Sequence, residues 1–260
     1  MSGSRSRGPG VADRKRVLIS VPRFGINPPE CDAYRNAMCY MLGRWESQPD
    51  CPYQFEFGLV PDMMVQLARE IAAKEAIRMN CDFLGMIDDD MLGPTDDQGV
   101  YLNLWKALLE DDVDIVAPLA FMRNPPHYPV CYARTGGWNP MTQMETFKYD
   151  NILNYPKDSF FECDGVGFGA VLIKVSALKT VGNSNWFMST NPTGEDLLFC
   201  NKARKKGLRV FMDTRVKLKH LGPRQYIDEA YFERYDAKAA AIREVTGDWS
   251  RAKAEQFLSS

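Results

Sequence analysis

The chain has 260 residues, of which 45% are hydrophobic and 25% are charged, and its formal net charge is −2. This length suits one large globular domain or two small ones. The slightly negative net charge argues against binding of nucleic acid through the overall charge of the protein. No apolar run approaches the roughly 18 residues that a membrane-spanning helix needs, so membrane insertion is not expected.

The seven cysteines include no Cys-x-x-Cys pair. An odd, scattered set of this kind indicates small buried side chains in a reducing cytoplasm, because a disulfide framework or a zinc site needs regular pairing.

Residues 1–16 are rich in Ser, Gly and Arg, which predicts a disordered basic tail. After this tail, apolar runs alternate with segments of helical periodicity. Strands are expected at 17–21, 55–60, 83–87 and 114–122, and helices at 32–45, 61–79 and 101–110. This alternation predicts an α/β fold, with a doubly wound, mostly parallel sheet and helices on both of its faces.

The second half of the chain has a different pattern. Residues 123–155 are rich in Pro, Gly and Asn with short β-like pieces, which predicts a small β insertion. Further strands are expected at 160–163, 170–175 and 209–213, a short helix capped by Ser176, a polar loop at 183–194 and a helix at 195–206. We expect one domain over 17–222 and a helical C-terminal extension over 223–260.

The stretch from Phe83 to Met91 is an apolar run that ends in Asp88, Asp89 and Asp90. These acids cannot continue into a core, so they lie where the strand emerges, at the edge of an α/β sheet that binds ligands. Alternation along an extended chain directs Asp88 and Asp90 to one side and Asp89 to the other. Because paired carboxylates repel each other, a divalent cation between them is expected, with substrate phosphates completing its shell.

The three acids also allow other interpretations. A solvated acidic turn is the simplest of them. A calcium EF-hand loop counted from Asp88 fails at its fifth position, Leu92, and at its twelfth, Gly99, where a Glu is required. A phosphohydrolase of the haloacid-dehalogenase type would use Asp88 as its nucleophile, although its signature has Thr or Val in place of Leu92. It remains the alternative enzyme.

Three segments, in this order, resemble the GT-A type glycosyltransferases, closest to the family-2-like enzymes of bacteria and phages. They are the strand with its Asp-x-Asp at 83–90, the helix start Gly194-Glu195-Asp196, and His220 between a strand and a Gly. Val166–Ile173 and Asp114–Arg123 add to the likeness, which covers about residues 17–222. It implies a GT-A (Rossmann-like) fold and a metal-dependent, inverting hexosyltransferase that uses a nucleotide-diphosphate sugar, with UDP-hexose favoured.

The resemblance also implies roles for individual residues. Mn²⁺ or Mg²⁺ would be held by Asp88, Asp90 and His220, the last as a neutral imidazole. Asp196 would be the base that deprotonates the acceptor hydroxyl, with Glu195 as the fallback. Acids in a first helical turn also suit the helix macrodipole, which is the alternative for this pair.

Donor binding is expected from residues beside the acidic strand end, namely Pro22, Arg23, Arg69, Asp88, Asp89 and Trp186. In this set, Pro22 and Arg23 would lie near the nucleoside, and Trp186 would stack on a donor or acceptor sugar. Arg69 occupies the place of a family arginine, but the Asn that usually follows is Glu70 here. A solvated charge is the alternative for Arg69.

The acceptor stays open between a hydroxymethylated base in phage DNA, a glycan and a protein hydroxyl. The basic tail and the basic run from Lys202 to Lys219 favour phosphate contacts, and Trp138, Trp186 and Phe187 are the aromatics available to stack on a flipped base. A catalytically silent nucleotide-sugar-binding module is a further alternative. The expected location is the cytoplasm of a bacterium or of a phage-infected cell.

Overall fold

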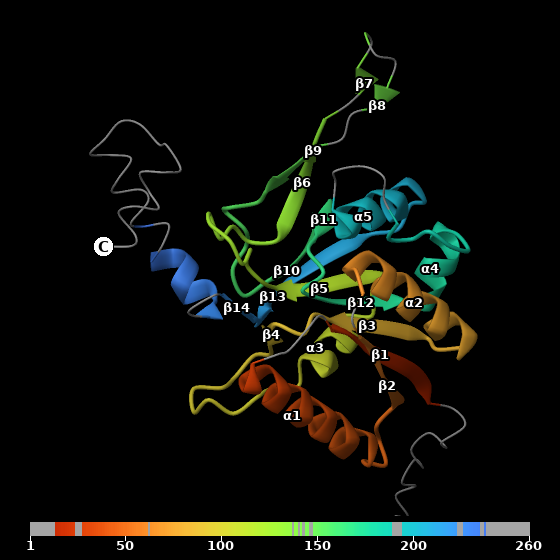
Figure 1. Ribbon diagram of the computed structural model, residues 1–260, viewed down its shortest axis with the longest axis vertical. Coiled ribbons are helices and arrows are strands. Elements are labelled where there is room, and N and C mark those ends of the chain that lie inside the picture. The colour runs from red at the N-terminus through yellow and green to blue at the C-terminus, as the bar shows by residue number, and fades with distance from the viewer. Residues whose placement is uncertain are drawn as a thin grey trace, which may run out of the picture.

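The computed structural model describes residues 14–23, 28–61, 63–136, 138–139, 141, 144–145, 148–188, 194–222, 226–234 and 237. Its centre is a seven-stranded sheet in the order β10-β13-β5-β12-β3-β1-β2 (Figure 1). These strands are β1 (Lys15–Arg23), β2 (Tyr53–Pro61), β3 (Phe83–Ile87), β5 (Ile115–Leu119), β10 (Phe160–Cys163), β12 (Ala170–Lys174) and β13 (Val210–Lys217).

Five of these strands run in one direction. β1 pairs in parallel with β2 and β3, and β5 pairs in parallel with β13. β12 is antiparallel to both of its neighbours, β3 and β5, and β10 is antiparallel to β13. The sheet is therefore mostly parallel, which confirms the predicted fold class.

Helices cover both faces of the sheet. They are α1 (Pro29–Glu46), α2 (Val65–Arg78), α3 (Leu104–Glu110), α4 (Val175–Val181) and α5 (Glu195–Lys205). Buried residues of α2, α4 and α5 form one core cluster, and those of α1 and α3 form the other. Alternate residues of β1 divide between them, since Leu18 packs in the first and Val17 and Ile19 in the second.

Strand β3 is buried along its whole length, which matches its unbroken apolar sequence. At its middle, Gly85 lets α3 approach the sheet closely. A Cβ at this position would lie 2.7 Å from both the Trp105 ring and the Ile19 side chain. The packing of Trp105 against β3 thus depends on a residue without a side chain.

Shorter strands complete the structure. β6 (Cys131–Thr135) lies between β9 (Lys148–Asn151) and β11 (Gly165–Val166), and β7 (Trp138–Asn139) pairs with β8 (Met144–Glu145). Figure 1 shows β7 and β8 projecting from the body of the molecule. Both strands lie within residues 123–155, where a small β insertion is predicted. β14 (Lys219–Leu221) lies between β4 (Met91–Leu92) and β15 (Tyr226–Ile227).

Several predicted boundaries were wrong. β1 begins at Lys15, so Lys15 and Arg16 belong to the sheet rather than to the tail, whose residues 1–13 lie outside the described part. The guanidinium of Arg16 donates to the Met79 carbonyl, and its backbone N–H donates to Asp82 at 2.7 Å. The helix predicted to begin at residue 61 begins at Val65 instead, since residue 61 still pairs in β2.

One further local expectation failed. α4 begins at Val175 without a side-chain cap, so Ser176 does not cap it. All seven cysteines are free and six of them are buried, as predicted, whereas Cys39, in α1, is exposed. Within the described ranges, no helix is long and apolar enough to cross a membrane.

Candidate functional site

The three acids follow β3 at its carboxyl end, as predicted. The chain turns at Asp89 and Asp90 instead of staying extended, so simple alternation does not set their directions. The Asp88 N–H donates to the Gly169 carbonyl at 2.8 Å, and the Asp90 carbonyl accepts the Leu221 N–H at 2.9 Å. Backbone contacts to Gly169, which directly precedes β12, and to β14 thus hold the acidic turn at both ends.

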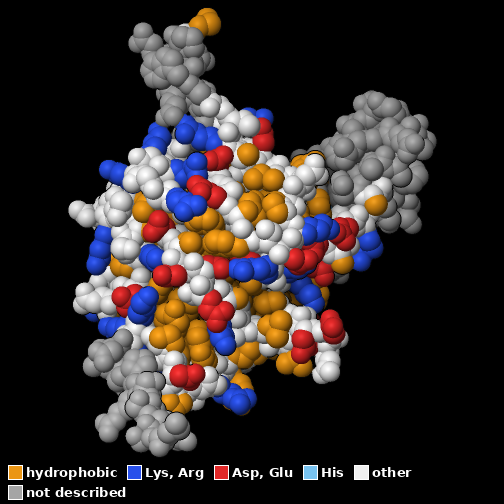
Figure 2. All heavy atoms as spheres, turned by 180° about the vertical axis from the view of Figure 1, so that it is seen from behind, with side chains coloured by type: hydrophobic (Ala, Val, Ile, Leu, Met, Phe, Trp, Pro, Cys, Tyr) orange, Lys and Arg blue, Asp and Glu red, His pale blue; other side chains and the backbone are white. Residues whose placement is uncertain are grey.

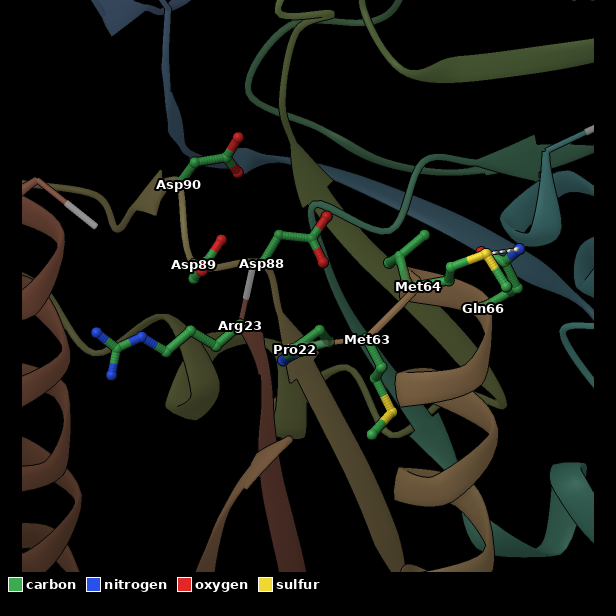
Figure 3. Close-up of a pocket in the computed structure, with 9 residues that line it drawn as sticks. Pro22, Arg23, Met63, Met64, Gln66, Asp88, Asp89 and Asp90 are labelled. Carbon is green, nitrogen blue, oxygen red and sulfur yellow. Dashed lines mark hydrogen bonds between the residues drawn. The ribbon is translucent and has the colours of Figure 1, made fainter. Parts of the chain in front are cut away.

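A cavity of about 370 Å³ opens beside the acidic turn. It is lined by Pro22, Arg23, Met63, Met64, Val65, Gln66, Asp88, Asp89 and Asp90. Figure 3 shows Pro22 and Arg23, at the end of β1, next to the acids that follow β3. The two parallel strands end at the same edge of the sheet, which brings these residues together.

Asp90 is in contact with His220. The Nε2 atom of His220 lies 3.1 Å from Oδ2 of Asp90, and its Nδ1 lies 2.8 Å from the Phe121 carbonyl. Burial lowers the pKa of His220, but the hydrogen bond and charge of Asp90 outweigh it, so the net shift is upward. Burial likewise raises the pKa of Asp90, but the contact with His220 and the charge of Arg123, whose Nη1 lies 3.5 Å from Oδ2 of Asp90, bring it below its usual value.

The Phe121 carbonyl determines which ring nitrogen of His220 carries a proton, and this limits how His220 can contact Asp90. A carbonyl oxygen can only accept, so Nδ1 of His220 carries a proton. A neutral imidazole would then turn the lone pair of Nε2 toward a carboxylate oxygen 3.1 Å away, and two acceptors at that distance repel. Either a second proton on the ring or a cation bound by both atoms satisfies this arrangement.

Arg69 is buried and pairs with two acidic residues, Asp88 and Glu195. Its Nη2 lies 2.8 and 2.9 Å from the two oxygens of Asp88 and donates to the Phe168 carbonyl at 3.0 Å. Its Nη1 forms an ion pair with Glu195. The side chain is only 3% exposed, so the alternative of a solvated charge is wrong. Burial raises the pKa of Asp88 to about 6, although the Arg69 charge opposes this.

Asp196 lies beside this group in the first turn of α5. Its Oδ1 accepts the Leu197 N–H at 2.7 Å. Burial raises the pKa of Asp196, and the negative charge of Glu195 raises it further. Gly194 precedes the pair, and a Cβ there would lie 2.6 Å from Oδ1 of Asp196. The glycine therefore leaves room for the carboxylate to take this position.

A second cavity, of about 310 Å³, has Asp88 in common with the first. Its charged lining comes from Arg69, Asp88, Glu195, Asp196 and His220, and apolar side chains such as Met91 and Phe168 complete its wall. Residues from four distant parts of the chain thus meet at one edge of the sheet. The two cavities share Val65 and Asp88 in their linings and together provide room for two ligand groups.

No protein-family model matches the chain, and no curated protein sequence matches it. Among solved structures, A197 from STIV aligns with a TM-score of 0.51 at 18% identity, over 82% of this chain and 93% of A197. The two chains share a fold.

Other solved structures align less well. The catalytic domain of Drosophila beta1,4galactosyltransferase 7 gives a TM-score of 0.45 at 16% identity, over 83% of this chain and 75% of that one. GalNAc-T7, crystallised with UDP, GalNAc and Mn²⁺, gives 0.42 at 11% identity, over 78% of this chain and 43% of that one. At such identities a likeness concerns the fold alone, so the chemistry of the site has to be argued from its own residues.

The predicted three-residue metal set is assembled only in part. Asp90 and His220 are in contact, whereas Asp88 is bound by Arg69. Over the described ranges, no group of three or more His, Cys, Asp or Glu side chains is arranged to hold a metal ion. Among the described residues, the site therefore offers a carboxylate and an imidazole at one point.

Trp186 does not serve as a stacking platform, which corrects the sequence prediction. Its side chain is 1% exposed, within the core cluster under α2, α4 and α5. The indole N–H donates to the carbonyls of Leu178 and Gly182 at 2.8 and 3.1 Å. Phe187 is buried in the same cluster, and the side chain of Trp138 lies outside the described part.

Glu70 is a structurally important residue that is absent from the predicted site. This residue is 2% exposed, and its carboxylate accepts the N–H groups of Asn185 and Phe187 at 2.6 and 3.3 Å. It therefore holds the loop that leads towards α5. The available signal was its place next to Arg69, where a charged residue departs from the pattern of the glycosyltransferases that the sequence resembles.

Met63, Met64 and Gln66 were also missed as cavity-lining residues. They follow β2, the strand beside β1, so they reach the same edge of the sheet as Pro22. A signal was present in the chain order, since the segment after each parallel strand is a candidate for the ligand-binding edge.

The basic run from Lys202 to Lys219 is largely engaged within the protein. Lys202 donates to the Asn185 and Trp186 carbonyls, and the arginines and Lys217 pair with acids (Arg204 with Asp164, Arg209 with Glu162, Arg215 with Asp213, Lys217 with Glu229). On the face shown in Figure 2, basic and acidic side chains are interspersed. The run thus offers fewer cations to phosphates than its sequence suggests.

Proposed function

We propose that the chain is a metal-dependent glycosyltransferase that moves a hexose from a nucleotide-diphosphate sugar, UDP-hexose favoured, to an acceptor hydroxyl. The contact between Asp90 and His220 carries this proposal. Two ligand side chains face each other at the ligand-binding edge of the sheet, and the tautomer of His220 directs a lone pair at Asp90 unless a cation or a proton intervenes.

The residues fit Mn²⁺ or Mg²⁺ bound together with a diphosphate. Asp90 and His220 would supply two ligands, and phosphate oxygens would complete the shell, as is usual for these cations. When bound, the cation would neutralise the charge that develops on the diphosphate leaving group. The Phe121 carbonyl holds the Nδ1 proton of His220 and so keeps Nε2 available as a ligand.

The two cavities suggest how donor and acceptor divide the site. The cavity beside Pro22 and Arg23 would take the nucleoside, and the one lined by Glu195 and Asp196 would take the transferred sugar and the acceptor. Asp196 is favoured as the base, because Glu195 is committed to its ion pair with Arg69. A single base acting directly implies inversion at the anomeric carbon.

Calorimetric titration of UDP, with Mn²⁺ and with excess chelator, tests the proposal. We expect measurable affinity only with Mn²⁺, and we expect Asp90→Asn to lose this metal-dependent binding while keeping its circular dichroism spectrum. Equal UDP affinity with chelator would contradict metal dependence. Binding of UDP-sugars without hydrolysis or transfer to any hydroxyl acceptor would instead indicate a silent binding module.

A further inference from the structure

Strand β14 lies between β4, which follows the acidic turn, and β15, which begins the segment 226–234. His220, in its middle, pairs with Met91 of β4 on one side and with Ile227 of β15 on the other. β14 has three residues and β4 has two, and strands this short are not stable by themselves. The position of the His220 backbone therefore depends on its pairing with β15, the next strand along the chain.

A second link reaches the His220 ring. Its Nδ1 proton is held by the carbonyl of Phe121, and the ring of Phe121 stacks on Phe232 with 5.0 Å between centroids and 24° between planes. Both aromatic side chains are buried. The segment 226–234 thus contacts His220 through its backbone and also packs on the residue that orients the imidazole.

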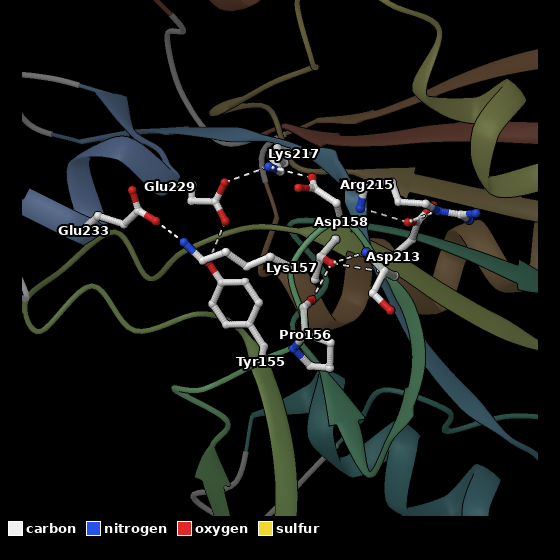
Figure 4. Close-up of polar contacts among 11 residues, drawn as sticks. Tyr155, Pro156, Lys157, Asp158, Asp213, Arg215, Lys217, Glu229 and Glu233 are labelled. Carbon is white, nitrogen blue, oxygen red and sulfur yellow. Dashed lines mark hydrogen bonds and ion pairs between the residues drawn. The ribbon is translucent and has the colours of Figure 1, made fainter.

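Glu229 fastens this segment to the body of the protein (Figure 4). Its carboxylate accepts the Tyr155 hydroxyl at 2.8 Å and pairs with Lys217 at 2.8 Å. Its side chain is 16% exposed, so these contacts are partly shielded from water. Glu233, one turn later, pairs with Lys157, but both of these side chains are more than half exposed.

We propose that residues 226–234 form a clamp that positions His220 for the metal, and that Glu229 and Phe232 are the positioning residues through which it acts. This inference rests on the proposed function, since it assigns His220 to the cation. Loss of the contacts made by Glu229 or by Phe232 leaves His220 in the protein but lets its imidazole ring rotate. Metal affinity is expected to fall, because a group that orients a metal ligand typically contributes about 10- to 100-fold.

The test compares Glu229→Ala and Phe232→Leu with Glu233→Ala as the matched control. Mn²⁺ is titrated at fixed UDP by calorimetry. We expect both clamp variants to need about 10-fold more Mn²⁺ for half-maximal UDP binding. At saturating Mn²⁺, UDP affinity should return to the wild-type value, whereas Glu233→Ala should behave as wild type throughout.

A second measurement does not depend on UDP. Hydrogen exchange of the Leu221 amide, which is bonded to the Asp90 carbonyl, reports the attachment of β14 to the acidic turn. We expect this exchange to speed up about 10-fold or more in Glu229→Ala, with no change in Glu233→Ala.

The outcomes separate the clamp from the proposed function. Metal-independent UDP binding by the wild type would overturn the function, and the Leu221 exchange would still test the clamp. Wild-type Mn²⁺ dependence and Leu221 protection in a folded Glu229→Ala or Phe232→Leu would overturn the clamp. An equal effect in Glu233→Ala would overturn it too. Thermal unfolding shows whether each variant is folded. If Glu229→Ala fails to fold, Phe232→Leu, which keeps an apolar side chain, tests the clamp instead.

Discussion

At the scale of single residues, the site separates two acids that are adjacent in sequence. Glu195 is paired with the buried Arg69, whereas Asp196 accepts a backbone N–H and has a raised pKa. A general base works best when its pKa lies near the working pH, so burial makes Asp196 better suited to the role than an ordinary aspartate.

Asp196→Asn should therefore lower the turnover number by about 10²- to 10⁴-fold with little change in UDP affinity, because it removes a contact made in the transition state. In the wild type, activity should fall as the pH drops through the raised pKa of Asp196, since a base must be deprotonated. Steady-state kinetics across pH would measure both. Near-normal turnover in Asp196→Asn would move the role to Glu195 or to another group.

Arg69 should also dominate local stability. Removing its guanidinium would leave Asp88 and Glu195 as unpaired, partly buried charges, and breaking such a pair costs about 3–5 kcal/mol. We expect Arg69→Ala to lower the free energy of unfolding by this amount in urea titrations.

Arg78→Ala is the control, because Arg78 lies on the same helix and pairs with Glu75 at an exposed position. Exposed ion pairs contribute little, so its unfolding midpoint should hardly move. Similar losses in the two variants would contradict the structural role of the buried pair.

At the scale of elements, the approach of α3 to β3 depends on Gly85. The added methyl of Gly85→Ala would meet the ring of Trp105, and such overpacking typically costs about 1–3 kcal/mol. Gly43→Ala provides the contrast. It lies in α1 with no atom within 4 Å of an added Cβ, so the variant should be more stable by about 0.5–1 kcal/mol.

Thermal and urea unfolding of the two alanine variants would measure these opposite signs. A Gly85→Ala protein as stable as wild type would mean that Trp105 can shift without loss of packing.

At the scale of the whole molecule, the distribution of charge bears on the acceptor. The net charge is −2, and much of the run from Lys202 to Lys219 is paired within the protein. We therefore favour a saccharide or protein hydroxyl over a DNA base. Labelled-sugar transfer to glycans and to hydroxymethylcytosine DNA, at several salt concentrations, would test this.

We expect label on the glycans and no salt-dependent binding of DNA. Label on hydroxymethylcytosine DNA, with an affinity that falls steeply with salt as phosphate contacts require, would reverse the preference. Unmodified DNA serves as the control, since it presents the same phosphates without the acceptor hydroxyl.

The sequence by itself determined the α/β order, the buried strand that ends in acids, and the acidic start of α5. These features follow from local periodicity, which records which side chains face a core and where a strand must leave it. The same local information placed Pro22, Arg23 and Asp88 at one sheet edge, because parallel strands end together.

Only the tertiary structure decided which of these side chains meet. Asp90 contacts His220 across 130 positions, and Arg69 pairs with Glu195 across 126. The tertiary structure also buries Trp186, for which the sequence predicts stacking on a sugar, and brings residues 226–234 against His220. Periodicity gives the burial of a residue within its own element, whereas partners at such separations depend on the order of strands and on the packing of the elements between them.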